Sequence, residues 1–120
     1  MSLTAYQHTL KATESPRDVE YRLFGQVTRA LLDIAPLPRT DPKVIDAIDW
    51  NRRLWSAMAL DCTNNDNAMP PQIRAGVISL SMFVARYSSQ VMTQSMPVDP
   101  LIDINRTIMQ GLAARAAAAA

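Results

Sequence analysis

The sequence predicts an all-α fold: a compact four-helix protein formed by a single domain over residues 1–120. Four segments carry apolar residues at three- and four-residue spacing, and each begins at a proline. The four starts are Ser15-Pro16, Asp41-Pro42, Pro70-Pro71 and Asp99-Pro100. Only three glycines are present, and no segment alternates apolar and polar residues as a half-buried strand does. The intervening stretches PLPRTD, CTNNDNAMPP and SMPVDP are rich in proline, asparagine and aspartate, which indicates loops.

The first helix is expected over residues 16–35. Ser15 can cap a free amide, Pro16 suits the first helical position, and Asp18 places a carboxylate in the positive first turn. The apolar stripe, which makes this an ordinary amphipathic helix, contains Val19, Leu23, Val27, Ala30 and Ile34, widened by Phe24 and Leu31.

The second helix is expected over residues 42–62, with Asp41 as its cap and Pro42 at its first position. Its main apolar stripe contains Val44, Ile48, Trp55, Met58 and Cys62. Ala47, Trp50 and Leu54 lie beside this stripe, so apolar residues cover more than half of the helix.

Two interpretations of this broad apolar surface stay open. Tryptophan and arginine are the residues most enriched at protein-binding hot spots, which makes Trp50, Leu54 and Arg53 candidate contacts. In the other interpretation, one tryptophan lies in the core and the other packs on the surface beneath an arginine. Asp49 and Arg53 stand four residues apart and can form an ion pair worth a few tenths of a kcal/mol.

The third helix, expected over residues 71–94, has two apolar stripes on roughly opposite sides. One contains Ile73, Val77, Leu80, Val84, Tyr87 and Val91. The other contains Ala75, Ile78, Met82, Ala85, Ser89 and Met92. We expect the other helices to surround this helix, with the first helix as one wall, because a helix that is apolar nearly all round is usually covered nearly all round. The alternative is that the second stripe receives a helix from another protein, since small side chains and methionine suit such a groove.

The fourth helix is expected over residues 100–115. Its stripe contains Leu101, Ile104, Ile108 and Leu112, with Asn105 either buried as a register-fixing polar group or half exposed at the edge. The closing run AARAAAAA has high helix propensity, so it either extends this helix or frays. A further short helix before residue 13 also stays open.

No catalytic, metal or cofactor site is predicted. His8 is the only histidine and has no cysteine or acidic partner at ligand spacing. Cys62 is the only cysteine, which excludes an internal disulfide, and we expect a buried, inert thiol. Glycine-rich phosphate loops and nucleophile elbows are missing. We therefore expect that the protein is not an enzyme.

Hydropathy and charge bear on membrane insertion and on nucleic acid binding. No apolar run approaches the roughly 18 residues needed to cross a bilayer, and the start MSLTAYQHTLKAT lacks the features of a secretory signal. A cytoplasmic protein without membrane insertion is expected. Twelve basic and eleven acidic residues are spread along the chain for a net charge of +1, so direct nucleic acid binding gains no support.

Four segments, in order, resemble the FlaF family of flagellar biosynthesis regulators: TAYQ, SPRDVEYRLFGQVTRAL, DWNRRLWS and PLIDINRTIMQGL. The resemblance runs from Tyr6 to Leu112 and leaves out the terminal alanines. It implies a cytoplasmic, non-enzymatic factor needed for production and export of flagellin, the filament subunit. It also implies flagellin as a partner, and FlbT, a second regulator that acts in the opposing sense, as a further candidate.

The expected mechanism is a chaperone that packs helix on helix against flagellin's adhesive terminal segments. The candidate contacts are Trp50, Arg53, Leu54, Ile78, Met82 and Ala85. An alternative is an RNA-binding regulator of flagellin messenger, which would need a basic stripe where the chain has only the pair Arg52-Arg53. A third interpretation is a homodimer whose second apolar faces cover one another.

Overall fold

The computed structural model describes residues 16–64, 66 and 69–119, with side chains from Val19 to Gly111 within those ranges. Among these residues there are four helices and no strand, which confirms the all-α class. The helices are α2 (Pro16–Ile34), α3 (Pro42–Cys62), α4 (Pro71–Gln94) and α5 (Asp99–Ala119). Their bounds lie within one residue of the expected ones, except that α5 continues through the alanine run. The expectations for His8, for the cap by Ser15 and for a helix before residue 13 lie outside the described residues.

The helix ends follow from local chemistry. The backbone amide of Lys43 donates to Oδ1 of Asp41 at 2.9 Å, so Asp41 caps α3 and Pro42 occupies the first turn, where no amide is needed. α4 begins after Pro70 without a side-chain cap and ends at Ser95, whose φ of 53° lies in the left-handed region.

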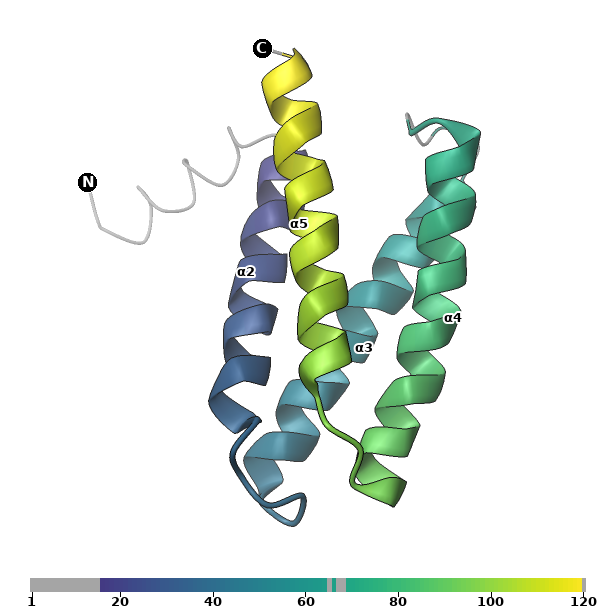
Figure 1. The fold of residues 1–120 in the computed structure, drawn as a ribbon. Coiled ribbons are helices and arrows are strands. Elements are labelled where there is room, and N and C mark those ends of the chain that lie inside the picture. The colour runs from purple at the N-terminus through teal and green to yellow at the C-terminus, as the bar shows by residue number, and fades with distance from the viewer. Residues whose placement is uncertain (1–15, 65, 67–68, 120) are drawn as a thin grey trace, which may run out of the picture.

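The four helices form a bundle (Figure 1). α2 packs against α3 and α5, and α3 packs on its other side against α4, whereas α4 and α5 touch only slightly. The expectation of a third helix surrounded by the others is therefore wrong: this helix, α4, lies at the edge of the bundle. Most of its packing is against α3, so Val77, Val84 and Val91 are buried, whereas Met82 and Ala85 on the opposite side are exposed.

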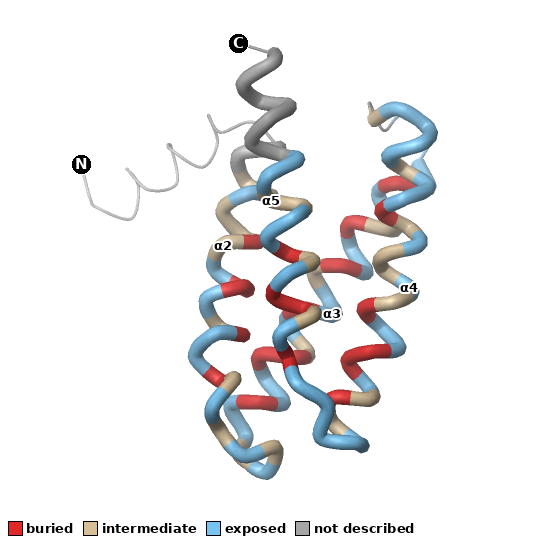
Figure 2. The backbone as a smooth tube through the Cα atoms, viewed as in Figure 1, coloured by how far each residue is buried: buried red, intermediate tan, exposed pale blue. Residues whose placement is uncertain are grey.

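The core lies where the inner sides of the four helices meet, as the buried positions in Figure 2 show. Trp55 is 1% exposed and meets the ring of Phe24 edge to face, with the ring centroids 5.5 Å apart. The buried stripes are rotated slightly from those expected. On α2, Val19, Leu23 and Ala30 are only half-buried, because the side that faces both α3 and α5 is centred on Phe24, Val27, Leu31 and Ile34.

A chain of hydrogen bonds crosses this apolar core. The Trp55 indole Nε1 donates to Oδ1 of Asn105 at 2.8 Å, and Nδ2 of Asn105 donates to Oδ1 of Asn51 at 2.8 Å. Asn51 and Asn105 are both fully buried. Of the two alternatives for Asn105, the structure thus shows the buried one. It also shows that Asn51 is buried between Ile48 and Trp55 in the stripe of α3, a position that a search for apolar residues does not find.

Side chains that bond to loop carbonyls tie the ends of the bundle together. Nη2 of Arg39 donates to the carbonyl of Met96 at 2.9 Å, which joins the α2–α3 loop to the α4–α5 loop. The Tyr87 hydroxyl donates to the carbonyl of Pro97 at 2.6 Å. At the other end, Arg74 donates from Nε to the carbonyl of Cys62 at 2.8 Å, so a side chain of α4 satisfies the carboxyl end of α3.

Candidate protein-binding surface

The described residues present exposed apolar side chains on the surface of the bundle. They contain no group of three or more histidine, cysteine, aspartate or glutamate side chains that could hold a metal ion. Cys62 is 1% exposed, and burial, followed by the charge of Asp61, raises the pKa of its thiol, so the reactive thiolate is disfavoured. None of the described helices combines the length and the apolar character that crossing a membrane requires.

The first surface is the outer side of α4, where the second apolar stripe of this helix lies open. Met82 is 67% exposed, Ala85 is exposed, and Ile78 and Met92 are half-buried. The expectation that other helices bury this stripe is wrong for Met82 and Ala85, which are exposed, whereas Ile78 and Met92 are half-buried and pack against the core. We name the exposed and half-buried members of the stripe the outer face of α4: Ala75, Ile78, Met82, Ala85, Ser89 and Met92.

The second surface is the seam between α4 and α5. A hollow of about 170 Å³ lies there, lined by Leu80 from α4 and by Asp103, Ile104 and Thr107 from α5. Leu80 and Ile104 are half-buried, since the two helices do not close over them. Each belongs to an apolar stripe that was expected to lie in the core. Periodicity alone does not show that these two side chains lie at the edge of the core, between α4 and α5.

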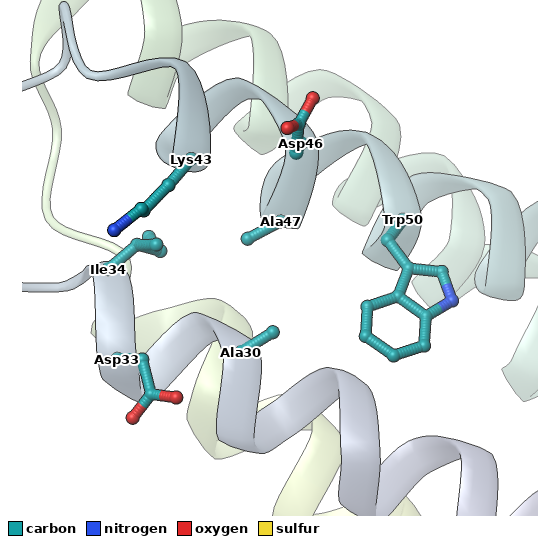
Figure 3. Close-up of a pocket in the computed structure, with 7 residues that line it drawn as sticks. All are labelled: Ala30, Asp33, Ile34, Lys43, Asp46, Ala47 and Trp50. Atoms are coloured by element: carbon teal, nitrogen blue, oxygen red, sulfur yellow. The ribbon is translucent and has the colours of Figure 1, made fainter.

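The third surface is a hollow between α2 and α3, with a volume of about 260 Å³ (Figure 3). This α2–α3 hollow is lined by Ala30, Asp33, Ile34, Lys43, Asp46, Ala47 and Trp50. Ala30 and Ala47 face each other across the two helices, and the ring of Trp50 stands at one end. Trp50 is 41% exposed, so a large aromatic surface borders a gap that two methyl groups leave unfilled.

The predicted contact residues are distributed over more than one of these surfaces. Trp50 lines the α2–α3 hollow, Leu54 is half-buried against the core, and Arg53 is exposed and paired with Asp49. The other three predicted contacts, Ile78, Met82 and Ala85, lie on the outer face of α4, whose main packing neighbour is α3. The six residues lie on two helices, α3 and α4, and their role in binding stays a prediction.

The two tryptophans differ as the second interpretation expected: Trp55 lies in the core and Trp50 on the surface. A guanidinium lies over a ring on α4, where Arg86 is 5.9 Å from the ring centroid of Phe83. Phe83 in turn stacks on Tyr87 with centroids 5.5 Å apart.

The α2–α3 hollow was not predicted from the sequence. The sequence feature that could have indicated it is a small residue in the apolar surface of each of two neighbouring helices, Ala30 and Ala47.

Comparison with known proteins identifies the family of the chain. No curated protein and no solved structure matches it. The family model of flagellar protein FlaF matches residues 2–112, which is most of the 120-residue chain and includes all four segments that carry the resemblance. The chain therefore belongs to the FlaF family of flagellar proteins.

Proposed function

We propose that this protein is a cytoplasmic, non-enzymatic chaperone that binds flagellin and promotes its synthesis and export. Membership of a flagellar family supports a role in building the flagellum. The exposed residues on the outer face of α4 support helix-on-helix binding as the mechanism. A helix of the partner protein placed on this face would bury the side of α4 that α3 does not cover. The terminal segments of flagellin, amphipathic and adhesive before assembly, are the proposed occupants.

The single observation that carries this proposal is the exposure of Met82. At 67% exposed, this side chain is far more open than a core position, although it lies on an apolar stripe of a long helix. Full burial of a methionine contributes roughly 1.5–3 kcal/mol. Covering the exposed part of Met82 would contribute about 1–2 kcal/mol on that scale, or a factor of about 5 to 30 in affinity. The flexible thioether also lets the face repack against an imperfectly matched helix.

The charges favour a protein partner over RNA. An RNA-binding surface needs several basic side chains facing the same phosphate backbone. Here Arg53 is paired with Asp49, and Arg29 is paired with Asp33 at 3.2 Å, so each of these cations is already balanced on its own helix. A partner that binds by apolar contact would show little dependence on salt.

The proposal is tested by Met82→Glu, with Leu32→Glu as the matched control. Leu32 is also an exposed large apolar residue, at 39%, but it lies on α2. We expect both variants to keep the helical circular dichroism of the wild type, because neither side chain is part of the core. Titration calorimetry with monomeric flagellin should show affinity at least fivefold weaker for Met82→Glu and within twofold of wild type for Leu32→Glu. Equal affinities for wild type and Met82→Glu would exclude the outer face of α4 as the binding site.

A further inference from the structure

We propose that the hollow between α4 and α5 is the docking site for the amino-terminal segment of this same chain, residues 1–15. Because no partner protein is involved, this docking is independent of the proposed function. The volume of the hollow, about 170 Å³, is below the roughly 300–1,000 Å³ of a small-molecule pocket. Side chains of a packed segment therefore suit the hollow better than a small ligand does.

Apolar side chains line the hollow and continue from it toward one end of the bundle. Leu80 on α4 and Ile104 on α5 are half-buried. Ile73 lies two turns before Leu80 on the same side of α4 and is 39% exposed. Ile108, which is half-buried, follows Ile104 by about one turn. The helices cover this row of four side chains only in part, so an apolar segment packed along the row would complete their burial.

The row leads to the end of the bundle at which residues 1–15 join α2. Figure 1 shows that α2 and α4 begin at this end and that α5 finishes there, whereas the loop after Gln94 joins α4 to α5 at the opposite end. Leu80 lies nine residues after Pro71, which is about 14 Å along the helix. Fifteen residues extend over about 22 Å as a helix and about 50 Å as an extended chain. The segment is therefore long enough to turn back from Pro16 and reach the hollow.

The apolar residues of the segment match such a row. Leu3, Tyr6 and Leu10 recur at three- and four-residue spacing, so a helix formed by these residues would be apolar on one side. An apolar side laid between two helices is the usual way in which an amphipathic helix is bound.

The charges of the segment and of the hollow are opposite. Through residue 13, Lys11 is the only charged side chain of the segment when His8 is neutral. Asp103 lines the hollow, and among the described residues the structure records no partner for its carboxylate. This acidic group favours a segment with a basic side chain over an acidic one.

The test introduces pairs of cysteines into the full chain. Gln7→Cys leaves the apolar residues of the segment in place, and Thr107→Cys provides the second thiol at the hollow. The control combines Gln7→Cys with Ser56→Cys, at an exposed position of α3, a helix that does not line the hollow. The native Cys62 is 1% exposed and should not react in the folded protein.

We expect the disulfide within one chain to form at least tenfold faster in the first pair than in the control pair, under mild oxidation of dilute protein and followed by mass spectrometry of the digested chain. Equal rates in the two pairs would overturn the proposal. A disulfide that forms between two chains instead would show that a second copy occupies the hollow, and would overturn it as well.

A second measurement needs no new thiol. The double variant Leu3→Ser with Leu10→Ser removes apolar side chains from the segment, and Gln7→Ser is the matched polar control. We expect the methyl resonances of Leu80 and Ile104 to shift in the double variant and to stay in place in the control. Methyl resonances that are unchanged in the double variant would contradict docking of this segment at the hollow.

Discussion

Replacement of Asn105 by leucine tests the view that a buried chain of hydrogen bonds sets the register between α3 and α5. Asn105 accepts from the Trp55 indole and donates to Asn51, each at 2.8 Å, and all three residues are at most 1% exposed. Leucine would leave the indole N–H and Oδ1 of Asn51 without partners. Each orphaned group costs about 1–3 kcal/mol, and the added apolar side chain offsets part of the loss. We expect Asn105→Leu to lower the free energy of unfolding by about 2–4 kcal/mol.

The double variant with Asn51→Leu sharpens this prediction. Nδ2 of Asn51 is already buried without a hydrogen-bond partner, so removing Asn51 together with Asn105 eliminates several unsatisfied atoms and leaves only the Trp55 N–H. The double variant should therefore lose at least 1 kcal/mol less stability than the sum of the two single variants.

The assay is urea unfolding followed by circular dichroism, in which a loss of 2–4 kcal/mol moves the midpoint by about 1–2 M for a typical denaturant slope. A typical domain is stable by about 5–15 kcal/mol, so the variants should remain folded in water. An Asn105→Leu protein as stable as the wild type, or single-variant losses that simply add, would refute the energetic role of this hydrogen-bond chain.

Three further predictions concern stability. Gly76→Ala should raise the free energy of unfolding by about 0.5–1 kcal/mol in urea titration, because a Cβ at this helical position meets no atom within 4 Å; a loss would contradict the open surroundings. Arg74→Met should lower it by about 1–2 kcal/mol, because the carbonyl end of α3 loses a charged donor, and an unchanged melting temperature would refute the cap. Burial, with a smaller effect of the Asp99 charge, raises the pKa of Tyr87, so the unfolded chain ionises first. The contribution of Tyr87 to stability should be complete below about pH 10 and lost as pH rises through the folded pKa, a dependence that Tyr87→Phe should reduce.

The helix boundaries could be predicted because their signals act within one turn. Asp41 and Pro42 cap and start α3 whatever the rest of the chain does, and the hydrogen bond from Lys43 to Asp41 shows that the cap forms. α5 continues past the expected end at residue 115 to Ala119, which is the alternative in which the alanine run extends the helix, since alanine has a high helix propensity.

The arrangement of the helices could not be predicted from periodicity, because an apolar stripe does not show which helix packs against it. Both stripes of α4 have the same spacing, yet Val84 is 1% exposed and Met82 is 67% exposed, since one faces α3 and the other faces outward. The same limit applies to the candidate site. Ala30 and Ala47 are ordinary helix residues when each is taken singly, and they form a hollow only because α2 and α3 meet at that register.

We propose that this FlaF-family protein holds the terminal helical segments of flagellin by apolar contact. The most direct measurement is titration calorimetry of the wild-type protein with intact monomeric flagellin and with flagellin that lacks its terminal segments, each at two salt concentrations. We expect stoichiometric binding that requires the terminal segments and changes little with salt. Failure to bind intact flagellin, or binding that survives removal of the terminal segments, would contradict it.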